Sequence, residues 1–124
     1  MDLELDGQTI THQVVDYAMT VMTDAGFGLH VENDYTFSAS TGSWDTFPEP
    51  AHAGSEQIPS LTNSTISSAT TDQSGALRVS FTDGRQLAVV PDADYEAWNL
   101  AGPDGRKVVC LPGGELAIWH AEVG

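Results

Sequence analysis

The chain has 124 residues, of which 40% are hydrophobic, and its formal net charge is −14 because 18 acidic residues face four basic ones. This length is typical of one domain with one modest core, and we expect residues 1–124 to form a single domain. Nucleic acids and anionic membranes are recognised by basic patches, so the charge excludes both as expected partners.

Cysteine content and the N-terminus indicate the compartment. The single Cys110 excludes an internal disulfide, and MDLELDGQTI has neither the basic residues nor the apolar run of a signal peptide. No stretch approaches the ~20 apolar residues of a membrane-spanning helix. We therefore expect a cytoplasmic protein.

Residues 13–35 predict a β-hairpin. Apolar side chains alternate on one face before and after a turn at residues 23–26, where Gly26 is free to adopt a positive φ. A helix would also bury several of these side chains. The density of β-branched residues and tyrosine favours strands.

Residues 38–60 are rich in Ser, Gly, Pro and acid, and they predict a long surface loop. The loop contains Trp44 and Phe47, which either pack back onto the core or form an exposed contact patch. Residues 55–62 predict a short helix with Ser55 as its N-cap.

Residues 76–90 predict a second, clearer hairpin around Asp83-Gly84. This dipeptide is typical of a type I′ turn, in which both central residues have φ > 0. Residues 21–35 and 80–95 also share an order of residues: apolar, Thr-Asp, Gly, Leu-x-Val, acid and Tyr. Internal duplication and coincidence between two hairpins both explain this likeness.

Two further strands, residues 107–111 and 115–120, are expected around the turn at residues 112–114. Their pair is the most apolar in the chain, so we place it centrally in the sheet, with Cys110 as a small hydrophobic residue of the core. The expected fold is mainly β, with α+β as the alternative. Antiparallel hairpins form a small sheet or sandwich, with one or two short helices.

The residues that carry chemistry form no familiar catalytic or metal-binding motif. There is no G-x-S-x-G elbow and no Walker lysine. The histidines lack H-x-x-x-H and H-x-H spacing; they are His12, His30, His52 and His120. We therefore expect no catalytic residue, no metal and no cofactor.

The segment PDADYEAW, residues 91–98, carries Asp92, Asp94 and Glu96 at alternate positions. A strand would place the three carboxylates on one face, whereas a helical turn would place two of them near its N-terminus. Asp-Ala-Asp weakens a strand, so we favour a short helical or irregular segment, with Trp98 in the core. The carboxylates are solvated acid, a docking surface, or a catalytic or cation site, although EF-hand spacing is absent.

Several motifs between residues 77 and 119 occur together in one known family. They are F-T-D-G (81–84), P-D-A-D-Y-E-A-W (91–98), G-P-D-G (102–105), V-V-C (108–110) and P-G-G-E-L-A-I-W (112–119). The chain resembles an uncharacterised family of small acidic domains common in actinobacteria, whose first strand is similar to D-Y-A-M-T-V (16–21). The family has no established activity. Similar small acidic domains often serve as immunity proteins beside polymorphic toxins, which is an analogy only.

The charge, the size and the lack of a catalytic motif lead to one main hypothesis. We expect a non-enzymatic acidic binding protein, an immunity-type inhibitor that neutralises a basic, toxin-like protein such as a nuclease by direct binding. The expected partner-binding residues are Glu32, Asp34, Trp44, Asp45, Phe47, Glu49, Glu56, Asp92, Asp94 and Glu96.

The alternative hypothesis belongs to a different class. It is a small ligand-binding or enzymatic domain, with an acidic site formed by Asp92, Asp94, Glu96 and Asp104. This alternative requires the four carboxylates to line one concave pocket. The oligomeric state is left open by the sequence.

Overall fold

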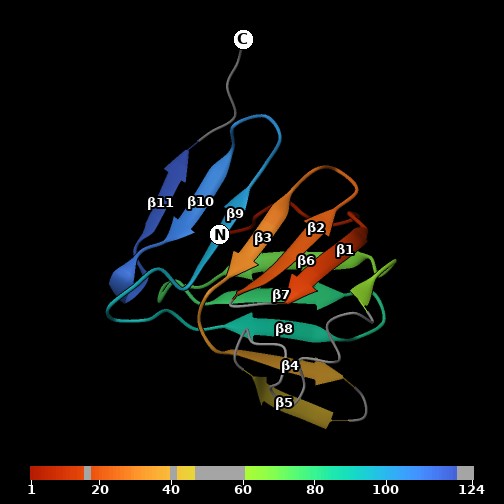
Figure 1. The fold of residues 1–124 in the computed structure, drawn as a ribbon, viewed down its shortest axis with the longest axis horizontal. Coiled ribbons are helices and arrows are strands. Elements are labelled where there is room, and N and C mark those ends of the chain that lie inside the picture. Colours follow the sequence, from red (N-terminus) through yellow and green to blue (C-terminus); the bar gives the residue numbers. More distant parts are fainter. Residues whose placement is uncertain (16–17, 40–41, 47–60, 120–124) are drawn as a thin grey trace.

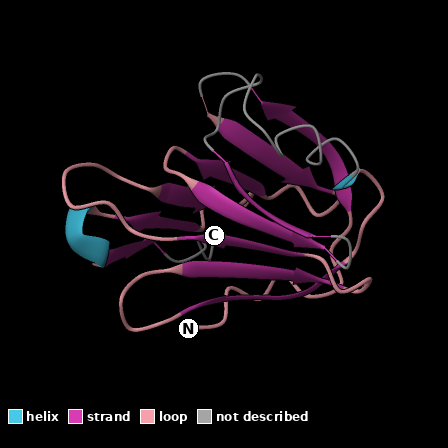
Figure 2. Ribbon diagram, turned by 90° about the horizontal axis from the view of Figure 1, so that it is seen from below, coloured by secondary structure: helices cyan, strands magenta, loops and turns pink. Residues whose placement is uncertain are grey.

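Short strands with alternating apolar residues build two antiparallel sheets that pack face to face (Figures 1 and 2). The computed structural model describes residues 1–15, 18–39, 42–46 and 61–119. The six-stranded sheet has the order β1 (Ile10–Val15), β2 (Met19–Thr23), β3 (Gly28–Val31), β9 (Trp98–Ala101), β10 (Lys107–Cys110) and β11 (Leu116–Trp119). The five-stranded sheet has the order β5 (Gly42–Thr46), β4 (Tyr35–Ala39), β8 (Gln86–Val89), β7 (Leu77–Phe81) and β6 (Ile66–Thr71).

The inner faces of the two sheets share one hydrophobic core. Alternation is clear in β2, where Met19 and Val21 are buried while Thr20 and Met22 are half-buried. Trp98 of one sheet and Phe37 of the other are fully buried, as the sequence predicts for Trp98. The prediction of a mainly β fold is therefore confirmed, in its sandwich form.

Helices contribute little to the described residues. These residues contain no α-helix, and the β10–β11 connection is a 3-10 turn, Pro112–Gly114. None of the helical segments in the part of the chain that the structure describes has the length and apolar character needed to cross a membrane. Most of the short helix expected at residues 55–62 lies outside the described residues.

The first predicted hairpin is present, but its first strand is shorter than expected. β2 and β3 pair around the turn at residues 23–26, and Gly26 has φ +85°. Residues 13–15 belong instead to β1, which pairs antiparallel with β2. Strand-like alternation continues on both sides of this reversal, so periodicity alone does not reveal it.

The second predicted hairpin is also present, but the type I′ turn is wrong. Gly84 has φ +91°, whereas Asp83 does not have a positive φ. The Phe81 N–H donates to the Arg85 carbonyl at 2.9 Å, and the Gly84 N–H donates to the Phe81 carbonyl at 3.0 Å. This is a three-residue loop with a left-handed glycine. The Asp83 carboxylate favours it by accepting from the Arg85 N–H at 3.0 Å.

Two predictions about strand placement are wrong. Gly42–Thr46, expected within the loop of residues 38–60, forms β5 and pairs with β4. β11, expected near the centre of a sheet, lies at its edge. An edge strand can be as apolar as a central one, so apolar content does not distinguish the two. In β11, Ile118 is 41% exposed.

Two turns from opposite sheets meet backbone to backbone. A Cβ added at Gly75, in the β6–β7 turn, would overlap the Gly114 carbonyl of the β10–β11 turn, and a Cβ at Gly114 would overlap the Ser74 carbonyl. The Trp98 indole N–H donates to the Gly75 carbonyl at 3.1 Å, inside the core. The approach requires glycine on both sides.

We predict that Gly75→Ala destabilises the fold by roughly 3 kcal/mol or more, because both a positive φ and a backbone overlap oppose the added Cβ. The matched control is Gly84→Ala, where φ is also positive but nothing lies within 4 Å of the added Cβ. The control variant is expected to lose only about 1–2 kcal/mol. Urea denaturation measures both, and equal losses would contradict the tight contact.

Candidate functional site

Among the described residues, the acidic side chains lie almost entirely outside the strands, in the N-terminal segment and in the connections between strands. Among the described strands, Asp45 is the acidic residue, and Arg78 and Lys107 are the basic ones. Inward-facing strand positions are filled by the core, and tight turns favour Asp beside Gly. Charge is therefore concentrated where the chain leaves the sheets.

Four connections lie together at one end of the sandwich, on the left in Figure 1. They are residues 32–34 (β3–β4), 72–76 (β6–β7), 90–97 (β8–β9) and 111–115 (β10–β11). We call these residues the acidic end. Its carboxylates belong to Glu32, Asp34, Asp72, Asp92, Asp94, Glu96 and Glu115, and none of the four connections contains Lys or Arg.

Hydrogen bonds fix these connections relative to one another. The Gly113 N–H donates to the Asp92 carbonyl at 2.7 Å, which joins the β10–β11 and β8–β9 connections. The Asn33 side-chain amide donates to the Val90 carbonyl at 3.0 Å and joins the β3–β4 connection to them. The β6–β7 turn is attached through Gly75. The acidic end is thus a defined surface and not a set of independent loops.

The opposite end of the sandwich is different because arginines lie beside some of its acids. Arg85 pairs with Asp83, with Nε 2.7 Å from Oδ2. Arg106 lies 3.9 Å from the Glu4 carboxylate, and its guanidinium stands 5.7 Å from the centre of the Phe27 ring. Two of the four basic residues in the chain are therefore committed to this end.

Two open grooves border the acidic end and share Ser74. One has a volume of about 430 Å³ and is lined by Asp92 and Glu115. The other has a volume of about 500 Å³ and is lined by Asp72 and by Arg78, which projects from the exposed face of β7. The acidic end thus combines carboxylates with concave surface.

Tyr95 is the aromatic side chain that the acidic end exposes, at 49% of its surface. Its hydroxyl donates to Asn33 Oδ1 at 3.3 Å. Partial desolvation raises the pKa of Tyr95 above its ordinary value, and the negative charge of Asp92 raises that pKa further. A ring surrounded by carboxylates is well suited to contact a Lys or Arg side chain.

Asp72 keeps its charge readily at this end. The Ser74 hydroxyl donates to its Oδ1 at 2.5 Å and the Ser74 N–H donates to the same atom at 2.8 Å. These bonds hold the pKa of Asp72 below its ordinary value, and the bond from the hydroxyl lowers that pKa more than the bond from the amide. The carboxylate is therefore ionised wherever a basic partner is also charged.

The structure brings half of the predicted partner-binding residues together. Glu32, Asp34, Asp92, Asp94 and Glu96 all lie at the acidic end. Trp44 and Asp45 lie on β5, opposite Phe37 and Thr36 of β4 respectively. Phe47, Glu49 and Glu56 lie outside the described residues.

The four-carboxylate site of the alternative hypothesis is not assembled. Asp104 lies in the β9–β10 turn, beyond the far end of β9 from the PDADYEAW segment. Its carboxylate accepts from the Arg106 N–H at 3.1 Å, at the opposite end of the sandwich. Residues 91–97 themselves are irregular, as predicted, and Asp92 lines a groove that the other three carboxylates do not.

Sequence reasoning missed three members of the acidic end: Asp72, Ser74 and Glu115. Asp72 and Glu115 each sit in a turn rich in Gly or Ser, which marks a connection but not its neighbours in space. Their proximity to Asp92 depends on strand order, and local sequence does not carry that information.

A second polar cluster lies on the exposed face of the six-stranded sheet. Thr20 Oγ1 is 2.9 Å from His30 Nδ1, and His30 Nε2 is 3.1 Å from Glu32 Oε1. Hydroxyl, imidazole and carboxylate in this order resemble a catalytic triad. Neither the interior cavity nor the two grooves beside Ser74 are lined by Thr20, His30 or Glu32. We therefore assign these three side chains to cross-strand stabilisation.

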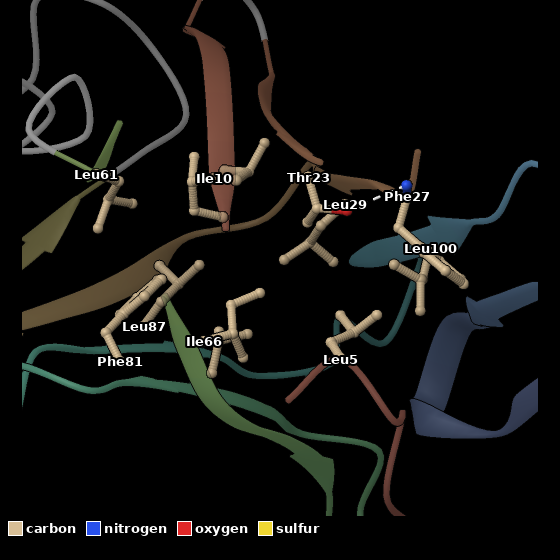
Figure 3. A pocket seen from close by; sticks show the side chains of 12 residues that line it. Leu5, Ile10, Thr23, Phe27, Leu29, Leu61, Ile66, Phe81, Leu87 and Leu100 are labelled. Carbon is tan, nitrogen blue, oxygen red and sulfur yellow. Dashed lines mark hydrogen bonds between the residues drawn. The ribbon is translucent and has the colours of Figure 1, made fainter. Parts of the chain in front are cut away.

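The interior holds a small apolar cavity between the sheets (Figure 3). Leu5, Ile10, Leu29 and Leu100 point toward it, and its volume is about 10 Å³. This is close to the volume that a single water requires, and the lining is apolar. Among the described residues, no group of three His, Cys, Asp or Glu side chains is placed to hold a metal ion.

We predict that Asp92→Asn lowers the pKa of Tyr95 toward its ordinary value of 10.0, because a negative charge beside the phenol is removed. Alkaline titration by ultraviolet absorbance, with Tyr95→Phe subtracted, measures this pKa.

The folded chain holds the phenolic proton more tightly than the unfolded chain, so this contribution to stability is lost as the pH rises past the raised pKa. Asp104→Asn, at the other end, is expected to leave the titration unchanged. An unchanged titration in Asp92→Asn would contradict the placement of its carboxylate beside Tyr95.

Comparison with known proteins gives a family but no activity. No curated protein and no solved structure matches the chain. Residues 1–120 match the model of the family described as "Family of unknown function (DUF6188)". The chain therefore belongs to the DUF6188 family.

Proposed function

We propose that this chain is a non-enzymatic binding protein whose acidic end docks a basic protein. The observation that carries the proposal is the segregation of charge described above. Carboxylates of four connections that contain no Lys or Arg converge on one end, with Arg78 of β7 at the border of one groove. At the other end Arg85 pairs with Asp83, and Arg106 lies 3.9 Å from the Glu4 carboxylate.

Electrostatics gives this arrangement a physical consequence. A surface with one sign of charge steers an oppositely charged protein toward itself and raises the rate of encounter, and salt screens the effect over about 8 Å at physiological ionic strength. The grooves beside Ser74, with volumes of about 500 and 430 Å³, offer concave surface to basic side chains of a partner. Tyr95 supplies an aromatic contact of the kind that often carries interface energy.

The partner that fits best is a basic toxin, for which this chain acts as an immunity-type inhibitor. A nuclease binds the phosphates of its substrate with cationic groups. Carboxylates held in fixed positions by backbone hydrogen bonds occupy such a site in place of phosphate. The support for this assignment is the charge, the fixed geometry and the analogy with small acidic immunity proteins.

The test uses two variants with the same change in net charge. Asp94→Asn, Glu96→Gln and Glu115→Gln together remove three of the seven carboxylates of the acidic end; Glu4→Gln, Asp6→Asn and Asp104→Asn together remove three carboxylates elsewhere. Each tagged protein is used to capture partners from the native host at low and at high salt, and captured proteins are identified by mass spectrometry.

We predict that wild type and the second variant retain the same basic protein at low salt. The acidic-end variant is expected to lose at least ~90% of it, since each lost contact with a charged partner weakens binding severalfold. Equal retention by the two variants, or recovery of no basic protein by wild type at either salt, would refute the proposal.

A further inference from the structure

The outer edge of β11 is bare in the described part of the chain. β11 ends the six-stranded sheet, and no described strand or bridge pairs with its outer side. All four residues from Leu116 to Trp119 are uncharged, and Ile118 and Trp119 are 41% and 52% exposed. A bare apolar edge is a template for pairing with another strand, which most proteins prevent by charge, proline or a covering segment.

Other sheet edges have such protection. Residues 1–8 run along β6, and the Leu3 N–H donates to the Ala69 carbonyl at 2.8 Å. Residues 63–65 cover the start of β1. β5 carries Asp45. The four residues of β11 carry no charge or proline, and no segment in the described part of the chain covers their outer side.

The ladder shows which groups of β11 face outward. The Leu111 N–H donates to the Glu115 carbonyl at 2.8 Å, and residues of an antiparallel pair bond to the same neighbour at alternate positions. Leu111 and Glu115 are therefore a bonded pair, and so is the pair two positions along, Val109 and Ala117. The N–H and C=O of Ala117 thus point toward β10. The N–H and C=O of Leu116 and Ile118 therefore point toward the bare edge.

We propose that β11 pairs antiparallel with β11 of a second copy of this chain, about a two-fold axis at Ala117. Leu116 of each copy then lies opposite Ile118 of the other, so all four outward backbone groups of each copy find partners. The same contact covers the exposed surface of Ile118. Such an interface is isologous, as closed dimers require.

Charge favours a second copy over a basic partner at this edge. β11 carries no acid that would attract a basic protein, and two chains of net charge −14 can approach only where charge is absent. Antiparallel pairing directs the two acidic ends away from each other. It also places Glu115 of each copy beside Trp119 of the other. Within one copy, Trp119 lies opposite Lys107 of β10.

The expected dimer is weak. Four residues of edge bury less than the ~1,200 Å² of standard stable interfaces. Association is expected to strengthen with salt, because screening reduces repulsion between like charges. Docking of a basic protein at the acidic end weakens with salt, so the two events are distinguishable.

Hydrogen exchange of the intact chain tests the proposal without any substitution. Backbone amide exchange is followed by NMR from dilute to concentrated protein in high salt. We predict that exchange at Leu116 and Ile118 slows at least about tenfold with concentration, while exchange at Ala117, already bonded to β10, does not change.

Two variants with the same added charge test the surface. Ile118→Lys places a charge on the edge, and Val14→Lys places one at an exposed apolar position of β1, where 52% of the valine is exposed. Sedimentation velocity at matched concentrations is expected to show dimer for wild type and Val14→Lys, and monomer for Ile118→Lys. If Ile118→Lys fails to fold, the exchange of wild type decides alone.

Monomeric wild type at every concentration, with unprotected amides at Leu116 and Ile118, would overturn the proposal. It would also be overturned if these amides became protected only when a basic protein is added, since the edge would then belong to that partner. If Val14→Lys abolished dimerisation and Ile118→Lys preserved it, the contact would lie on another surface. That result would also overturn the proposal.

Discussion

The contact on which the acidic end depends is the close approach of Gly75 and Gly114. These residues belong to turns of different sheets. A Cβ at Gly75 would overlap Gly114, and a Cβ at Gly114 would overlap the carbonyl of Ser74, the neighbour of Gly75. Their approach lets the buried Trp98 indole reach the Gly75 carbonyl. The polar N–H of the largest core side chain is therefore hydrogen-bonded to a turn of the other sheet. The same approach brings the carboxylates of Asp72 and Glu115 to the same end as Asp92.

The distribution of charge follows from the sandwich. The chain has 18 acidic and four basic residues, and most strand positions are buried or half-buried. Few positions in the strands are therefore available to charged side chains. Turns take the acids, because Asp stabilises them through its own side-chain bonds, as Asp72, Asp83 and Asp104 do. Strand order then decides which turns are neighbours. It produces one end whose connections carry carboxylates and no Lys or Arg, and another end where arginines lie beside some of the acids.

Local features of the fold were predictable, and non-local ones were not. Alternation and Gly placement identified the hairpins at Gly26 and Gly84, and the weakness of Asp-Ala-Asp as a strand identified the irregular segment before Trp98. The turn type at Asp83 was missed because its carboxylate stabilises a loop in which only the glycine is left-handed. β11 was misplaced because apolar content is shared by central and edge strands. Within the site, the PDADYEAW carboxylates were found, whereas their union with Asp72 and Glu115 required the approach of two turns from different sheets at Gly75 and Gly114.

The central claim is that binding occurs at the acidic end. Hydrogen exchange of the chain bound to its basic partner, compared with the free chain, tests this most directly. The account predicts new protection in residues 32–34, 72–76, 90–97 and 111–115, with little change in residues 23–27 and 101–106. Protection confined to the latter turns, or to the exposed face of either sheet, would contradict it.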